Sequence, residues 1–212
     1  MFEQVIPRNA KNSLAILGES GLLRNVYLAG GTALALQLGH RISVDFDFFT
    51  AKEFDEQEVV RELSKLPLSF QLEKKEKNTI LGVVGKTKFS LFFYDYPLLA
   101  KTEKFLDINI ASIKDISAMK LAAIADRGKK RDFFDLYFIL AKEKLLTLKD
   151  VLDLYDKKFK LLHQNRTHLL KSLTYFDDAE GTKVPKMLKE VKWKEVKKFF
   201  EREVKYLAKQ EF

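Results

Sequence analysis

The amino-acid sequence predicts an α+β protein in which a mixed sheet flanked by helices is followed by a helical C-terminal part. Residues 1–112 contain short runs of β-branched and aromatic residues between polar or glycine-containing turns, a pattern typical of strands. Residues 113–212 instead repeat their apolar residues at helical spacing. We therefore expect an α/β core at 1–112 and a helical domain at 113–212.

Predicted strands and helices alternate in the first half. The segment SVDFDFFT (43–50) alternates and is rich in aromatic and β-branched residues, so it is predicted as a strand with Val44, Phe46 and Phe48 facing a core. Gly39 is placed to end the helix before it. We expect, in chain order, helix 8–19, strand 26–30, helix 32–38, strand 43–50, helix 53–66, three strands within 68–96 broken at 74–78 and 85–88, and one more strand at 106–112.

The second half is predicted to be helical throughout. Asp115 is a candidate N-cap of a helix that continues to about Arg127, where Gly128 can end it. Trp193 is expected on an amphipathic helix that covers a core. The other helices are expected at 133–144, 148–162, 165–175 and 187–209.

The composition excludes some classes of protein and of site. The 212 residues include no cysteine, which excludes disulfides and thiolate metal sites. His163 and His168 lie five residues apart, which suits no metal pair on one helical face, so both are interpreted as ordinary surface residues. No run of about 18 apolar residues could span a bilayer, and the N-terminus lacks a signal-peptide pattern. We expect a cytoplasmic protein with no membrane segment.

Positive charge is concentrated towards the C-terminus. The formal net charge is +8, and residues 142–212 hold 18 basic and 12 acidic residues, a net charge of +6. A basic region of this kind can attract a polyanion such as nucleic acid. A lysine-rich solvated helical face explains the same charge, so composition leaves both interpretations open.

The stretch GGTALALQLGHRISVDFDFF combines the parts of a site for phosphate and metal. Gly30 and Gly31 let the backbone approach a phosphate, and the amides that open the next helix carry partial positive charge. The Thr32 hydroxyl can donate to a phosphate oxygen. Asp45 and Asp47 share one face of the predicted strand, and paired carboxylates suit Mg²⁺ that is also bound by substrate phosphates. Together these features predict phosphoryl or nucleotidyl transfer.

A Gly-Gly-Thr turn, a short helix and an Asp-x-Asp pair on the next strand resemble the polymerase-β-type nucleotidyltransferase superfamily. The full stretch is similar to one branch of it, the AbiEii/AbiGii toxin family. A second stretch, KDISAMKLAAIADRGKKRDFFDLYFIL, resembles the later motifs of that branch, with Lys120 on a helix and then Arg131, Asp132 and Asp135 at a helix start. The resemblance implies a polymerase-β-type core and nucleotidyltransferase activity.

The second stretch can also be interpreted without the family. Lys120 and Arg127 lie seven residues apart, near one helical face, and could bracket a triphosphate. Asp132 could cap its helix, and Asp135 is expected beside it on the surface. A capped helix hairpin with ordinary charge pairs would have the same sequence pattern. The resemblance implies that Lys120 contacts nucleotide phosphates and that Asp132 acts as a general base or orients the acceptor hydroxyl.

The sequence departs from the superfamily at the third metal-binding acid, which many of its enzymes carry on a later strand. The equivalent segment here, KFSLFFYDYP, has no acid in its middle. Asp95 near its end and Asp107 further on are the candidates. Either one Mg²⁺ held by the Asp-x-Asp pair and the triphosphate suffices, or Asp132 supplies the missing acid, which is the arrangement we favour.

The expected protein is an Mg²⁺-dependent enzyme that transfers a nucleoside monophosphate from an NTP and releases pyrophosphate. The resemblance implies a toxin–antitoxin role with a separate antitoxin protein, and it suggests RNA, tRNA included, as the acceptor. A small-molecule or protein hydroxyl as acceptor stays open, as does a degenerate fold that binds nucleotide or RNA without turnover.

The site residues follow from these motifs. Arg41 could neutralise phosphate or the aspartate pair, and structural ion pairing explains it equally well. Asp45 and Asp47 are the expected metal ligands. The expected catalytic residues are Asp45, Asp47, Lys120 and Asp132; the expected nucleotide-binding residues are Gly30, Gly31, Thr32, Arg41, Lys120, Arg127 and Arg131; Asp135 and Asp95 are further candidates.

Overall fold

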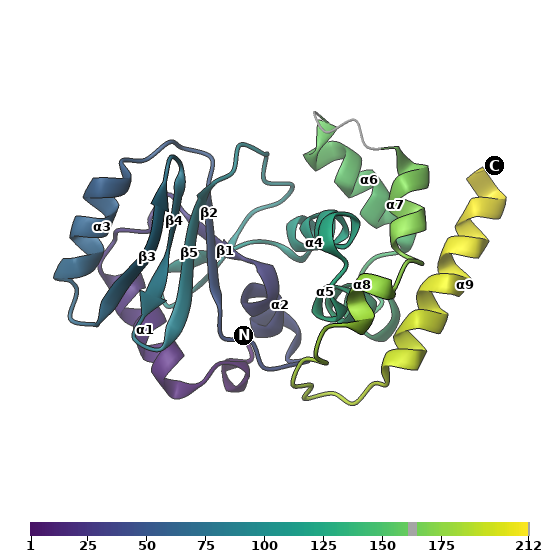
Figure 1. Cartoon of the computed structure of the whole chain (residues 1–212), viewed down its shortest axis with the longest axis horizontal. Coiled ribbons are helices and arrows are strands. Elements are labelled where there is room, and N and C mark those ends of the chain that lie inside the picture. The colour runs from purple at the N-terminus through teal and green to yellow at the C-terminus, as the bar shows by residue number, and fades with distance from the viewer. Residues whose placement is uncertain (161–164, 212) are drawn as a thin grey trace. The chain divides into compact units, whose positions relative to one another are not determined.

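The structure, a computed structural model, describes residues 1–160 and 165–211 (Figure 1). Residue contacts divide the chain into two compact units, Met1–Ser112 and Ile113–Phe212. The first contains all the described strands and the second is helical. None of the described helices is long and apolar enough to cross a membrane.

The first unit is built on a seven-stranded mixed sheet in the order β3-β4-β5-β2-β1-β7-β6. β1 pairs antiparallel with β2 and parallel with β7, β2 pairs parallel with β5, and the other pairs are antiparallel. The glycine turn and the aspartate pair are therefore carried by the central strands. The strands are β1 (Tyr27–Ala29), β2 (Phe46–Thr50), β3 (Phe70–Glu76), β4 (Thr79–Val84), β5 (Thr87–Phe93), β6 (Glu103–Phe105) and β7 (Ile108–Ile110).

Side chains along β2 alternate between a buried face of the sheet and a partly exposed one. Phe46 and Phe48 are fully buried, and the Phe48 ring packs against Phe89 of β5 with the ring centroids 5.5 Å apart. Asp47 and Phe49 point to the opposite face, where both are half-buried. The core face thus anchors the strand while Asp47 projects away from it.

Short helices accompany the sheet in this unit: η1 (Glu3–Val5), α1 (Arg8–Glu19), α2 (Gly30–Leu38) and α3 (Glu56–Lys65). α1 contacts β7, α3 contacts β3 and β4, and α2 contacts β1 and β2 (Figure 1). The predicted stop at Gly39 is confirmed, because Gly39 has a φ of 63° and its amide bonds the Ala35 carbonyl at 2.8 Å.

The expected strand 43–50 begins three residues late. Ala29, the last residue of β1, pairs with Asp47, so the chain before Phe46 has no partner on β1. Asp45 therefore precedes the strand. Val44, which was expected in the core, is 38% exposed, so that prediction was wrong.

Two further boundaries in this unit differ from expectation. The strand expected at 106–112 is a hairpin of β6 and β7, whose turn residues Leu106 and Asp107 have positive φ values. β3 continues to Glu76 through part of the expected break, because its charged side chains project into solvent from an edge strand.

The second unit is organised around α4, which contacts α5, α6 and α7 (Figure 1). α5 continues into a π-helical turn, η2, instead of the single helix expected at 133–144. Residues 161–162, the end of another expected helix, and His163 lie outside the described residues. The helices are α4 (Ile113–Arg127), α5 (Lys130–Tyr137), η2 (Phe138–Lys142), α6 (Leu148–Lys158), α7 (Arg166–Ser172), α8 (Asp177–Glu180) and α9 (Trp193–Glu211).

The last helix, α9, is amphipathic as predicted. Its buried positions include Val196, Phe200 and Leu207. At its start, the Trp193 ring packs against Phe133 and Phe134 of α5, with 5.7 Å between ring centroids in both pairs. Trp193 is thus part of the packing of this unit.

A buried ion pair replaces the cap expected at the start of α4. Asp115 lies within the first turn of the helix, and its carboxylate accepts a 2.8 Å hydrogen bond from Lys158 of α6. Both side chains are fully buried. The prediction of Asp115 as an N-cap was wrong, because the tertiary contact with α6 takes its carboxylate into the core.

Candidate active site

In the first unit, β1 runs directly into α2 through a glycine with left-handed backbone. Gly30 has a φ of 66°, a conformation that glycine adopts without a steric penalty. Ala29, the N-cap residue of α2, has no polar side chain, and no side-chain cap is described for this helix end. The positive end of α2 is therefore suited to an anion.

The Asp47 carboxylate lies against this turn. A Cβ atom added to Gly30 would lie 2.8 Å from Oδ2 of Asp47, closer than real Cβ contacts allow. The sheet register explains the approach, because Ala29 and Asp47 are directly paired between β1 and β2. Glycine is thus needed at position 30 for its backbone conformation and for the space it leaves to a carboxylate.

Arg41 brings a positive charge under the same turn. A Cβ atom on Gly31 would collide with the Arg41 guanidinium, which is 4% exposed. The Nη1 atom of Arg41 donates a 3.2 Å hydrogen bond to the Ile42 carbonyl. The guanidinium is therefore held against the glycine turn, where it adds to the positive potential at the start of α2.

Thr32 fastens the first turn of α2 to the chain that carries Asp45. Its hydroxyl donates a 2.6 Å hydrogen bond to the Asp45 carbonyl and lies 3.0 Å from the Ser43 hydroxyl. The residue is 1% exposed. The sequence suggested that this hydroxyl donates to a phosphate oxygen. In the structure it donates to the Asp45 carbonyl, and the side chain thereby positions Asp45 relative to α2.

The strand on which a third acid was expected has a serine beside the aspartate pair. Ser90 of β5 pairs directly with Asp47 of β2, and paired residues of neighbouring strands project to the same face. Asp95 lies exposed after β5, and Asp107 lies in the β6–β7 turn. Within residues 1–160 and 165–211, no group of three or more His, Cys, Asp or Glu side chains is arranged to hold a metal.

The residues present nevertheless fit a single hard cation whose remaining ligands come from a substrate. Asp45 and Asp47 are both half-buried, and Asp47 lies in a cradle that a Cβ atom would fill. Oxygen ligands of this kind suit Mg²⁺, which usually retains water and takes phosphate oxygens to complete its shell. Ser90 could add a hydroxyl oxygen but no charge.

In the second unit, Lys120 lies between two buried carboxylates. Its Nζ atom is 2.8 Å from Oδ1 of Asp132 and 2.6 Å from Oδ2 of Asp135. Both aspartates are fully buried, and the Lys120 side chain is 7% exposed. The expectation that Asp135 lies on the surface was wrong, because α5 begins at Lys130 and turns both carboxylates inward towards α4.

The second oxygen of Asp132 is differently placed. Among the described residues, Asp132 Oδ2 is buried without a hydrogen-bond partner. The Nε atom of Arg127, whose side chain is 47% exposed, lies 3.8 Å from this oxygen. The cluster thus pairs two cations with two carboxylates and leaves one carboxylate oxygen able to accept a proton or hydrogen bond from a ligand.

The structure therefore brings the predicted residues together as two clusters, one in each unit. Gly30, Gly31, Thr32, Arg41, Asp45 and Asp47 form the first; Lys120, Arg127, Asp132 and Asp135 form the second, and Arg131 lies half-exposed at the start of α5. Sequence reasoning missed Ser43 and Ser90. The strand register alone identifies Ser90, since it lies 43 positions from Asp47 in the chain.

Comparison with known proteins identifies a family and a close relative in sequence. The family described as Nucleotidyl transferase AbiEii toxin, Type IV TA system, matches residues 13–90 and 87–209. An uncharacterized protein of Aquifex aeolicus (strain VF5) is 40% identical over 204 residues, which cover 94% of this chain and 96% of that protein.

Solved structures share the fold at lower identity. JHP933 from Helicobacter pylori has a TM-score of 0.55 at 24% identity, over 99% of this chain and 95% of that chain. MenT4, a nucleotidyltransferase toxin from Mycobacterium tuberculosis H37Rv, has a TM-score of 0.56 at 15% identity, over 93% of this chain and 86% of that chain.

Proposed function

Because the chain belongs to the AbiEii nucleotidyltransferase toxin family, and is thus a nucleotidyltransferase, we propose that it transfers a nucleoside monophosphate from an NTP to an RNA hydroxyl in an Mg²⁺-dependent reaction. The observation that carries the proposal is the contact of the Asp47 carboxylate with the Gly30 backbone at the start of α2. The contact supports the proposal because it brings a carboxylate oxygen, a type of ligand that Mg²⁺ prefers, next to helix amides of the kind that bind phosphate.

The proposed roles in the first unit follow from that contact. The amides of Gly31 and Thr32 hold phosphate oxygens of the NTP, and the buried Arg41 guanidinium raises the positive potential beneath them. Asp45 and Asp47 are the proposed ligands of Mg²⁺, which supplies neutralisation of phosphate charge when it is bound. Positioning and charge neutralisation account for most of the catalysis in a reaction of this type.

In the second unit, Asp132 is the proposed group for the acceptor hydroxyl. Its Oδ1 is engaged by Lys120, while its buried Oδ2 has no described hydrogen-bond partner and can accept the hydroxyl proton. Asp135 shares the Lys120 charge, so Lys120 does not fully neutralise Asp132. We assign phosphate binding to Arg127, whose side chain is accessible, in preference to Lys120, whose ammonium group is already bonded to both Asp132 and Asp135.

RNA is the proposed acceptor because of a basic stripe on α9, defined as Lys194, Lys198, Arg202, Lys205 and Lys209. All five are exposed, and their spacing of four, four, three and four residues places them on one helical face, opposite the apolar one. The stripe extends about 22 Å at the helical rise. Such a row of cations matches the charge of an RNA backbone better than that of a neutral or cationic small molecule.

The family also leads us to propose a partner and a location. As the toxin of a toxin–antitoxin pair, the protein would be controlled by a separate antitoxin protein. Its NTP substrate requires a compartment that holds nucleoside triphosphates, and we propose the cytoplasm.

A labelled-nucleotide transfer assay tests the proposal. The purified protein is incubated with Mg²⁺, each α-labelled NTP in turn, and total RNA, protein or no acceptor. We expect label on RNA, and we expect Asp45→Asn and Asp47→Asn to lower it by at least ~10²-fold, as for loss of a main electrostatic group. Glu73→Gln, which removes the charge of an exposed acid on β3, is the control and should leave transfer unchanged.

The controls separate the alternatives. If the Asp45 and Asp47 variants label RNA as strongly as the wild type, the proposed metal ligands are wrong. Labelling of protein and not of RNA would disprove the proposed acceptor while leaving the nucleotidyltransferase chemistry in place.

A further inference from the structure

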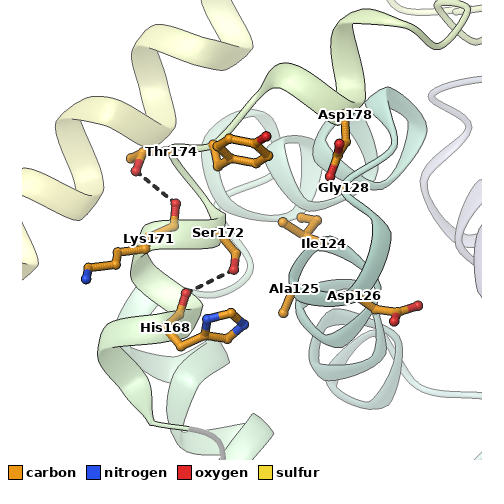
Figure 2. Close-up of a pocket in the computed structure, with 10 residues that line it drawn as sticks. Ile124, Ala125, Asp126, Gly128, His168, Lys171, Ser172, Thr174 and Asp178 are labelled. Carbon is orange, nitrogen blue, oxygen red and sulfur yellow. Dashed lines mark hydrogen bonds between the residues drawn. The ribbon is translucent and has the colours of Figure 1, made fainter.

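A pocket of about 480 Å³ opens in the second unit between the end of α4, α7 and α8 (Figure 2). Its volume lies within the usual range for small-molecule sites, about 300–1,000 Å³. Ile124 and Ala125 form an apolar wall on α4, and Gly128 lies beside them in the lining. None of the reactions assigned above uses this pocket.

The opposite wall carries aromatic and polar side chains. Figure 2 shows the His168 imidazole of α7 pointing across the pocket towards Ala125, and the Asp178 carboxylate pointing towards Gly128. Tyr175 also lines the pocket and is 54% exposed. Figure 2 shows Lys171 and Asp126 pointing away from the centre, so the side chains that point inward are aromatic rings and the carboxylate of Asp178.

The end of α7 holds these groups in place. The Ser172 hydroxyl donates a 2.9 Å hydrogen bond to the His168 carbonyl, and the Thr174 hydroxyl donates a 3.0 Å bond to the Lys171 carbonyl (Figure 2). The Tyr175 amide bonds the Ser172 carbonyl at 3.3 Å. The segment that carries His168 and Tyr175 is therefore fixed by hydrogen bonds to carbonyls in the last turn of α7.

The pocket shares the last turn of α4 with the Asp132 cluster. Asp126 and Gly128 belong to its lining, and Arg127 between them approaches Oδ2 of Asp132. A Cβ atom on Gly128 would lie 3.8 Å from Cβ of Asp178 and 3.9 Å from the ring of Phe133, the residue after Asp132. The pocket therefore lies against the same end of α4 from which Arg127 approaches Asp132.

We propose that this pocket binds a nucleobase, an assignment that rests on the proposed function. Unstacked bases are recognised by stacking on Tyr or His rings and by hydrogen bonds at their edges. Here Tyr175 and His168 supply the rings, Ile124 and Ala125 the apolar surface, and Asp178 an acceptor for a base amino or imino group. The base belongs either to the RNA acceptor or to the NTP. Both carry the same kind of planar base, which the pocket would recognise in the same way.

Fluorescence of 2-aminopurine tests the assignment without requiring turnover. One probe is a short RNA with 2-aminopurine at its 3′ end, and the other is 2-aminopurine riboside triphosphate with Mg²⁺. We expect one probe to bind with a change of fluorescence, and we expect Tyr175→Ala to weaken its binding about tenfold, within the range for loss of one base–aromatic stack. Tyr175→Phe should retain binding, because the ring is kept.

Leu188→Ala is the control, since Leu188 is an apolar residue of the same unit, 45% exposed, outside the pocket and before α9. A selective loss in the RNA arm assigns the pocket to the acceptor, and a selective loss in the NTP arm assigns it to the donor. Equal binding by Tyr175→Ala and the wild type, or equal losses in the Tyr175 and Leu188 variants, would overturn the nucleobase site. The Asp45→Asn variant should bind the RNA probe normally, so failure of the catalytic proposal is measured separately.

Discussion

Oδ2 of Asp47 lies 2.8 Å from the position that a Cβ atom on Gly30 would occupy, because Ala29, the residue before Gly30, pairs with Asp47 between β1 and β2. The contact joins the two motifs of the first unit, the glycine turn and the aspartate pair. It also shows why the glycine matters beyond its backbone freedom: a side chain at position 30 would move the carboxylate.

Gly30→Ala should therefore abolish most activity at a modest cost in stability. The left-handed backbone costs about 1–2 kcal/mol for a residue with a Cβ atom, and a displacement of about 1 Å in an active site can cost ~10²-fold in rate. The matched control is Gly85→Ala, where φ is 63° but the nearest atom is a serine hydroxyl oxygen 3.1 Å away. Thermal unfolding should show a similar loss of stability for both variants, and the transfer assay should show a loss of activity for Gly30→Ala alone.

Ser90→Asp should make the stability of the first unit depend on metal. The new carboxylate would lie beside Asp47 on the same face, and its repulsion without metal should cost about 1 kcal/mol, the order of one exposed charge pair. Added Mg²⁺ or Mn²⁺ should reverse the loss and bind more tightly than in the wild type. Calorimetric Mn²⁺ titration measures this, with Ser90→Asn as the uncharged control; equal Mn²⁺ affinity in all three proteins would contradict the assignment of Ser90 to the third-acid position.

Lys120→Met should destabilise the protein by about 3–5 kcal/mol, because it leaves two buried carboxylates without their cation. Adding Asp135→Asn should recover part of that loss. Lys158→Met breaks the other buried pair, with Asp115, and should cost a similar amount. Chemical unfolding measures these free energies.

Transfer activity of the folded protein separates the two lysines. At a temperature where both variants are folded, Lys158→Met should retain activity and Lys120→Met should lose it, since only Lys120 bonds the Asp132 carboxylate. Equal activity in both would assign Lys120 a purely structural role.

Thr147→Ala should weaken the start of α6 in a pH-dependent way. Thr147 and Asp150 form a capping box, and the hydrogen bonds from the Thr147 side chain and amide lower the pKa of Asp150 from its ordinary value of 3.8. A depressed carboxyl pKa contributes stability above the unfolded pKa, and this is lost as the pH falls through the folded pKa. The variant should lose about 1 kcal/mol near neutral pH.

The difference between wild type and Thr147→Ala should therefore shrink as the pH falls below about 4, the ordinary range of an aspartate. Ser64→Ala is the control, because the Ser64 hydroxyl bonds only the Val60 carbonyl among the described partners. Its effect on thermal unfolding should not vary over the same pH range. A constant difference for Thr147→Ala would contradict the coupling to Asp150.

Replacement of Lys194, Lys198, Lys205 and Lys209 of the basic stripe by glutamine should weaken RNA binding and lower its salt dependence. Four lost phosphate contacts should reduce the slope of log K against log salt by up to about 3 for a single strand. The control changes four exposed lysines of the first unit to glutamine, Lys75, Lys77, Lys86 and Lys88, for the same change in net charge. Equal slopes for the two variants in filter-binding measurements would show that net charge, and not the stripe, attracts RNA.

Much of the fold was predictable because its signals are local. Gly39 ends α2 through its own backbone conformation, and Phe46, Asp47 and Phe48 alternate across β2 as a strand requires. Val44 failed the same alternation, because whether a residue joins the sheet depends on a partner strand and not on its neighbours. The order of the seven strands, and hence Ser90 beside Asp47, could not be inferred from segments considered one at a time.

The amino-acid pattern alone identified the motifs, the family to which they belong and the residues that carry charge. The tertiary structure decided which of those charges meet. It buried Lys120 between Asp132 and Asp135, paired Asp115 with Lys158 across 43 positions of sequence, and used the Thr32 hydroxyl on Asp45. Burial makes an unpaired charge costly, so packing between helices selects the partners, and no local pattern records that choice.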